Sequence, residues 1–262
     1  MSELRLDGVC VDRGGRRVVN DVSITVPAGE VTAVLGPNGA GKSSMVLAVG
    51  GVLRPRPGSV SLDGAELAGR RPEKIRAAGV AIVPEGRRLL PDLSVEDNIR
   101  VATYALSKQA AAEGRARALE LFPALEPRLT VPARSLSGGE QQMVVLAQAL
   151  VSQPRYILID ELSLGLAPVV VNRLIPVIRA LVSSGIGVLL IEQFATVALG
   201  LATSAYVMEG GLIRYSGTAS ELRDNPELLH SAYLLRGSSA APATGQAPVP
   251  GAPSATPPEA VG

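Results

Sequence analysis

The chain has 262 residues, of which 47% are hydrophobic, and its 25 Lys and Arg against 24 Asp and Glu give a net charge of +1. This composition suits a packed core rather than global disorder, and the balanced charge gives no reason to expect a nucleic-acid partner. A single cysteine, Cys10, and a single histidine, His230, rule out an internal disulfide and leave too few ligands for a protein-built zinc site.

The first third of the chain is predicted to consist mainly of strands. Gly14-Gly15 and Asp63-Gly64 are typical of turns between paired strands, and residues 43–52 read as a helix after a glycine-rich loop. The predicted strands share short apolar or β-branched runs, and they cover residues 4–11, 18–26, 31–35, 59–62 and 80–83.

The middle of the chain is predicted to be helical. Ser94 with Asp97, and Ser137 with Glu140, have the spacing of capping boxes. The three predicted helices cover residues 95–108, 110–121 and 138–152. The block of about residues 85–152 is therefore expected to form a helical lobe inserted between strands.

The last part of the chain alternates between strands and helices, which predicts a mostly parallel sheet with helices on its faces. The predicted strands are residues 156–159, 188–191, 206–208 and 212–215, and the predicted helices are residues 168–182, 194–201 and 225–235. Residues 237–262 are almost entirely Ala, Pro, Gly and Ser, so we expect a disordered tail after a domain that covers residues 1–236.

One apolar stretch, residues 185–208, carries a single charge, Glu192, and hydropathy alone would allow it to span a membrane. A charge in the middle of a bilayer is costly, and Glu192-Gln193 interrupts the stretch. A buried strand followed by a short helix therefore explains it better.

A glycine-rich segment fits the phosphate-loop pattern at every fixed position. Its backbone N–H groups can surround phosphate oxygens, Lys42 can reach the terminal phosphates, and the Ser43 hydroxyl can hold Mg²⁺. The alternative is a glycine-rich turn with an incidental Lys-Ser, which the complete match disfavours. The candidate nucleotide-binding residues here are Gly36, Pro37, Asn38, Gly39, Ala40, Gly41, Lys42, Ser43 and Ser44.

Two carboxylates, Asp160 and Glu161, follow the apolar run of residues 156–159. Asp160 at the end of the strand can orient the magnesium shell, and Glu161 can polarise a water for in-line attack on a phosphate. Many buried strands end in an acid, so the phosphate loop is what gives this pair its significance.

A third element is the helix start at Ser137, Gly138 and Gly139. A capping box accounts for the serine, but two successive glycines at a helix start lower helix propensity. We attribute the glycines to an anion that approaches the backbone closely, with the hydroxyl and the helix dipole facing a γ-phosphate.

In this order the three elements resemble those of the ABC transporter ATPase family, over about residues 3–236. The resemblance implies an α/β fold with a P-loop NTPase (RecA-like) core, an antiparallel β lobe and an inserted helical lobe. It also implies an ATPase that uses ATP and Mg²⁺, in which two such domains sandwich two ATP molecules. Each ATP would then meet the phosphate loop of one domain and the signature, here Ser137 to Gly139, of the other.

A finer resemblance is to the branched-chain amino acid uptake subfamily, through residues 82–88, 163–168, 191–193 and 231–234. Glu85 stands at the lobe hinge where most ABC ATPases have glutamine, and it is implied to hold a water or the metal. Gln193 stands where most have histidine, so it can hydrogen-bond a γ-phosphate or water but carries no titrating proton. Leu162 replaces the usual proline after the catalytic glutamate.

The position that usually stacks an aromatic ring on adenine corresponds to Arg13, with Val18 beside the base. The guanidinium plane of Arg13 could take the place of the ring. The alternative is an exposed arginine on a hairpin.

The resemblance also implies partners. They are a second ABC ATPase subunit, identical or related, two membrane permease subunits, and indirectly a solute-binding protein, with this chain peripheral on the cytoplasmic face of the cell membrane. A permease helix would dock near residues 85–92. A related urea or amide importer stays open, as does a soluble ABC ATPase, although those usually carry two modules or coiled-coil insertions. The signature disfavours a P-loop kinase or GTPase.

Overall fold

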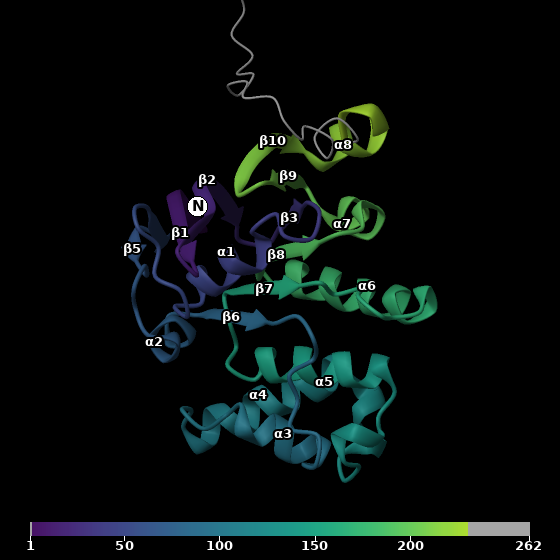
Figure 1. The fold of residues 1–262 in the computed structure, drawn as a ribbon. Coiled ribbons are helices and arrows are strands. Elements are labelled where there is room, and N and C mark those ends of the chain that lie inside the picture. Colours follow the sequence, from purple (N-terminus) through teal and green to yellow (C-terminus); the bar gives the residue numbers. More distant parts are fainter. Residues whose placement is uncertain (1, 230–262) are drawn as a thin grey trace, which may run out of the picture.

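Two β-sheets form the framework of the protein in a computed structural model that describes residues 2–229 (Figure 1). The smaller sheet is antiparallel, with strand order β2-β1-β4-β5. Its strands are β1 (Glu3–Arg13), β2 (Arg16–Pro27), β4 (Ser59–Leu62) and β5 (Ala65–Glu66). Both predicted hairpins, with turns at Gly14-Gly15 and Asp63-Gly64, are confirmed.

The larger sheet has the strand order β10-β9-β3-β8-β7-β6. The five strands β9, β3, β8, β7 and β6 run parallel to one another, and β10 is antiparallel to β9. The bounds are β3 (Val31–Leu35), β6 (Val80–Val83), β7 (Tyr156–Asp160), β8 (Gly187–Glu192), β9 (Ser204–Glu209) and β10 (Leu212–Thr218). The α/β fold is therefore confirmed, and the carboxyl ends of β3, β7 and β8 meet at one edge of the sheet.

The helices around the sheets are α1 (Lys42–Val49), α2 (Pro72–Ala77), α6 (Pro168–Ser183), α7 (Ala195–Leu201) and α8 (Ala219–Asp224). Between β6 and β7 the chain forms α3 (Val95–Val101), α4 (Lys108–Leu121), the 3₁₀ helices Pro123–Arg128 and Ala133–Ser135, and α5 (Gly138–Leu150). Figure 1 shows α3, α4 and α5 together beyond β6, at the opposite end of the large sheet from β10 and α8.

Several predicted helix boundaries were wrong. The helix expected over residues 95–108 ends at Val101, because a tightened turn follows and Ser107 begins α4 by accepting a hydrogen bond from Ala110 N. Helix α1 ends at Val49, ahead of Gly51, whose φ of 74° is left-handed. Helix α5 ends at Leu150 rather than Ser152.

Helices α2 and α8 are additional elements that the sequence did not indicate. Of the helix expected over 225–235, residues 226–229 are helical and the rest lie outside the described residues. The tail of residues 237–262, the domain end at 236, His230 and the segment 231–234 also lie outside them.

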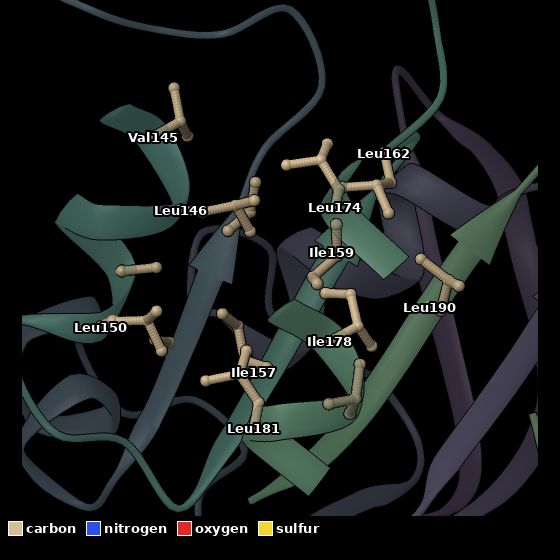
Figure 2. Close-up of a cluster of buried hydrophobic side chains, with 14 of the residues drawn as sticks. Val145, Leu146, Leu150, Ile157, Ile159, Leu162, Leu174, Ile178, Leu181 and Leu190 are labelled. Carbon is tan, nitrogen blue, oxygen red and sulfur yellow. The ribbon is translucent and has the colours of Figure 1, made fainter. Parts of the chain in front are cut away.

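The central strands β3, β8 and β7 of the large sheet are buried at every position, which explains why they are mostly apolar. Along β7, Ile157 and Ile159 face a cluster built with α5 and α6, whereas Tyr156 and Leu158 face a second cluster built with α1 and the small sheet. Figure 2 shows the first cluster, where Leu146 and Leu150 of α5 and Ile178 and Leu181 of α6 pack around β7. Leu162, at the position where relatives have proline, is fully buried in the same cluster.

The apolar stretch of residues 185–208 divides into β8, α7 and β9, as the strand-and-helix interpretation predicted. Among residues 2–229, no helix combines the length and the apolar content that crossing a membrane requires.

Candidate nucleotide site

The phosphate loop joins β3 to α1 at the carboxyl edge of the large sheet. Its conformation needs glycine at position 41, where φ is 104° and a Cβ would lie 2.3 Å from Val18 O. Lys42 is 4% exposed, and its Nζ donates hydrogen bonds to Gly36 O at 2.7 Å and Pro37 O at 3.0 Å. The loop therefore surrounds its own lysine, and the amine lies within it.

The carboxylates after β7 lie beside this loop. Asp160 is buried, and its Oδ1 is one of the buried side-chain atoms of the described chain without a hydrogen-bond partner. Glu161 has a φ of 57°, in the left-handed region that side chains other than glycine rarely adopt, and its N–H donates to Ile191 O at 2.9 Å. The backbone at Glu161 is thus held in a costly conformation by the neighbouring strand β8.

Burial and like charge dominate the electrostatics of the site. Burial raises the pKa of Asp160, opposed by a hydrogen bond from the Ser43 hydroxyl. Burial also raises the pKa of Glu161, and the charges of Glu85 and Asp160 raise it further. Burial lowers the pKa of Lys42, while the nearby carboxylates of Glu161 and Asp160 oppose that shift. Several carboxylates therefore surround a single amine, an arrangement that favours an additional cation.

An open cleft of about 400 Å³ lies over the phosphate loop. The structure brings most of the predicted residues together around it, including Arg13 and Val18 from the hairpin, Glu85 from the segment after β6, and Glu161. The full lining is Arg13, Val18, Asn38, Gly39, Ala40, Gly41, Lys42, Ser43, Ser44, Glu85 and Glu161. Gly36 and Pro37 lie beneath it as acceptors for Lys42.

The start of α5 does not line this cleft. The predicted capping box is confirmed: Ser137 Oγ accepts from Glu140 N at 3.3 Å, and Glu140 Oε2 accepts from Ser137 N at 2.8 Å. A Cβ at Gly138 would lie 2.9 Å from Arg87 Nη1, and one at Gly139 would lie 2.6 Å from Val170 Cγ1. A side chain at Gly139 would clash with Val170, and one at Gly138 would displace the flexible end of Arg87, contacts that the sequence did not reveal. The approach of both glycines to an anion stays a prediction.

Glu192 is a residue of this region that sequence reasoning missed. It is 1% exposed, and its carboxylate accepts hydrogen bonds from Ser163 N at 3.0 Å and Ser163 Oγ at 2.9 Å. Burial raises its pKa, and the bonds from Ser163 oppose the shift. The sequence does contain an indication of this role, because a single charged residue within an apolar stretch indicates a buried carboxylate with hydrogen-bond partners. Gln193, the predicted switch residue, follows it directly at the end of β8 and does not line the cleft.

A family model described as ABC transporter matches residues 19–163, more than half of the chain. The chain belongs to the ABC transporter family. As an ABC ATPase it binds and hydrolyses ATP, which excludes the kinase and GTPase interpretations.

Several curated proteins resemble this ABC ATPase over most of their length. It is 39% identical over 231 residues to the high-affinity branched-chain amino acid transport ATP-binding protein BraG of Pseudomonas aeruginosa, covering 88% of this chain and 99% of BraG. It is 31% identical to the probable branched-chain amino acid transport ATP-binding protein LivF of Archaeoglobus fulgidus, covering 79% and 89%. The lipopolysaccharide export system ATP-binding protein LptB of Escherichia coli K12 is 34% identical, covering 79% and 87%.

Solved structures agree with the fold. An ATP-binding subunit of an ABC transporter superposes with a TM-score of 0.75 at 30% identity, covering 88% of this chain and 98% of that one. An ATP-binding cassette in its ADP conformation gives a TM-score of 0.79 at 24% identity, with coverage of 88% and 98%. This second likeness concerns the fold alone.

Proposed function

We propose that the chain is the ATP-binding and hydrolysing subunit that powers an importer of branched-chain amino acids. The observation that carries the proposal is the 39% identity to BraG across 99% of that protein's length. The segments 82–88, 163–168 and 191–193, which resemble the same subfamily, agree with it. The match to LptB has lower identity and covers less of the relative.

In this proposal the phosphate loop and Lys42 bind the phosphates of ATP. Oxygen ligands suit Mg²⁺, and the Ser43 hydroxyl and the partnerless Oδ1 of Asp160 would hold it, with Glu85 nearby at the cleft. Among residues 2–229 no cluster of three or more His, Cys, Asp or Glu could bind a metal alone, which agrees with an ion that shares its ligands with ATP. When bound, the ion would offset the charge on the β- and γ-phosphates.

Glu161 is the carboxylate that orients the attacking water. Its raised pKa makes it a stronger base once ionised, and its position on the cleft faces the terminal phosphate held by the loop. Gln193 would add a hydrogen bond to the γ-phosphate or to that water. Removing the Glu161 charge while keeping its shape should therefore block hydrolysis and spare ATP binding.

The signature acts on the ATP of a second ABC ATPase subunit. Ser137 is exposed at the start of α5 and lies outside the cleft of its own chain, as a residue that completes a partner's site should. The α5 N-terminus would then point its free N–H groups at the γ-phosphate. Adenine would rest on Arg13 and Val18 at the outer end of the cleft.

A groove of about 390 Å³ between α2, α3 and α5 is the proposed docking site for a short helix of a membrane permease subunit. Its rim carries Val101 and Tyr104, which are 47% and 70% exposed. Leu90, at 45% exposure, lies in the segment 85–92 where docking was expected, two positions after the groove residue Arg88. Two permease subunits would then hold the pair of ATPases on the cytoplasmic face of the membrane.

The transport proposal is tested by reconstituting the chain in liposomes with the permease subunits and the binding protein encoded beside its gene. Leucine, isoleucine and valine should each drive ATP-dependent uptake, and the Glu161→Gln variant should abolish it. Uptake of urea or short amides instead, or none with an assembled complex, would contradict the assignment.

The docking groove is tested in the same complex by cross-linking Leu90→Cys to cysteines in the permease loops. The matched control is Leu228→Cys, since Leu228 is also exposed, at 39%, and follows α8 in the chain, far in sequence from residues 85–92. A cross-link from position 90 alone is expected, and equal yields from both positions would count against the groove.

A further inference from the structure

Arg87 follows the hinge residue Glu85 and lies between the helical segments and the loop after Glu161. It is partly buried, and its φ of 46° is unusual for a side-chain-bearing residue. Its Nη2 donates hydrogen bonds to Leu164 O at 2.9 Å and Gly165 O at 3.3 Å. The guanidinium is therefore fixed to the loop that leads from the catalytic carboxylate to α6.

The same guanidinium lies against the first residue of α5. A Cβ at Gly138 would be 2.9 Å from Nη1 and 3.4 Å from Cζ of Arg87, and a Cβ at Gly165 would be 3.6 Å from Nη2. Both contact positions are glycines, so no side chain separates the guanidinium from either backbone. One planar group therefore contacts the signature turn and the loop of residues 162–167 at once.

The other end of this loop is also held. Ser163, two residues after Glu161, is bound through its N–H and hydroxyl by the buried Glu192 at the end of β8. The loop is thus fixed by Glu192 next to the catalytic carboxylate and by Arg87 next to the signature. A movement of α5 relative to the large sheet must either carry Arg87 and this loop along or separate the guanidinium from Gly138.

We propose that Arg87 is a positioning residue that fixes the signature turn to the loop after Glu161, and so couples the two ATP sites of the dimer. The proposal rests on the proposed function, in which the signature meets the ATP of the partner while Glu161 acts on the ATP of its own chain. Arg87 then links a sensor of one ATP to the catalytic carboxylate at the other. A guanidinium suits this role because its rigid fork can donate in several directions at once, which a lysine ammonium cannot reproduce.

The test compares Arg87→Ala and Arg87→Lys with the control Arg179→Ala, an equivalent change at an exposed position on α6. Three quantities are measured: ATP affinity of dilute single chains, kcat, and the Hill coefficient of ATP hydrolysis. Arg87→Ala should leave single-chain affinity within about twofold and lower kcat at least about fivefold, the lower end of typical coupling between sites. Its Hill coefficient should fall from near 2, the limit for two sites, toward about 1. Arg87→Lys should give intermediate values.

A double-mutant cycle separates positioning from general loss of structure. Adding Arg87→Ala to a Ser137→Ala chain should lower kcat much less than adding it to the wild type, because both changes act through the signature. Thermal unfolding midpoints show whether each variant is folded. If Arg87→Ala is not folded, Arg87→Lys replaces it in the same measurements.

The proposal is overturned if Arg87→Ala matches Arg179→Ala in kcat and Hill coefficient, or if it mainly weakens single-chain ATP binding. Ser137→Arg, assayed in parallel, tells the two proposals apart. If Ser137→Arg leaves hydrolysis intact, the shared ATP site itself is wrong. If Ser137→Arg abolishes hydrolysis while Arg87→Ala does not lower it, only the role of Arg87 is wrong.

Discussion

The buried carboxylate of Glu192 should stabilise the fold through Ser163. Hydrogen bonds to charged groups contribute about 1.5–3 kcal/mol each, and Glu192 accepts one from Ser163 N at 3.0 Å and one from Ser163 Oγ at 2.9 Å. Ser163→Ala removes one of the two bonds, so we expect the free energy of unfolding to fall by about 2 kcal/mol. Glu192→Ala removes both and leaves the Ser163 N–H unpaired, so a loss of about 3–6 kcal/mol, twice that for one bond, is expected.

Glu192→Gln separates shape from charge. An amide can accept from Ser163 N–H and donate to Ser163 Oγ, so the variant keeps both contacts while it removes a buried charge. Because burial raises the pKa of Glu192 in the folded protein, the wild type loses stability relative to Glu192→Gln as pH rises through that raised pKa. The variant should therefore be as stable as the wild type, or more stable, at pH 8, and lose this advantage at low pH.

Urea unfolding of the nucleotide-free chains, followed by circular dichroism, measures these effects. In a double-mutant cycle, Glu192→Ala and Ser163→Ala should show a coupling of about 1.5–3 kcal/mol. If the loss of stability in the double variant equals the sum of the two single losses to within about 0.5 kcal/mol, the pair does not interact as the structure indicates.

Four changes at the ATP cleft have separate expected outcomes. Lys42→Ala should abolish ATP binding without lowering the thermal unfolding midpoint, and unchanged nucleotide affinity would refute its role. Glu161→Gln should bind ATP but lower kcat by about 10²–10⁴-fold, and near-normal turnover would assign the water to another residue. Because Glu85 raises the pKa of Glu161, Glu85→Gln should move the acidic limb of the kcat profile to lower pH; a shift to higher pH would contradict the repulsion. Arg13→Ala should weaken ATP binding by about 1 kcal/mol, measured by titration, while Arg13→Tyr preserves it; equal affinity for wild type and Arg13→Ala would refute stacking.

Elements with strong local signals were predicted well from the sequence. The apolar strand at residues 156–159 and the phosphate loop each depend on a short run of residues, and both lie where the sequence placed them. The cleft joins Arg13, Lys42, Glu85 and Glu161 from four separate segments of the chain. Only the family resemblance had linked Arg13 and Glu85 to ATP.

The features that were missed depend on contacts between distant segments. Nothing near Gly138 or Gly139 in the sequence indicates that Arg87 and Val170 fill the space that side chains there would need. The pairing of Glu192 with Ser163 likewise spans 29 positions and follows from the adjacency of β7 and β8. Local propensity also gave the wrong end for α3, because a turn follows Val101 in which the hydroxyl and the N–H of Thr103 both donate to Arg100 O.

The central claim, that two chains enclose each ATP, is tested most directly by cross-linking between chains. Asn38 in the phosphate loop and Ser137 in the signature are both exposed, and the native Cys10 is buried, so Asn38→Cys and Ser137→Cys provide selective attachment points. Two variants are prepared, one with Asn38→Cys and one with Ser137→Cys. Both also carry Glu161→Gln, and tags of different length distinguish them. The two variants are mixed and treated with a short bismaleimide. With ATP and Mg²⁺ the account predicts a product that contains one chain of each kind, and very little without ATP. A cross-link within single chains that carry both cysteines, formed at high dilution, or no ATP-dependent product, would contradict it.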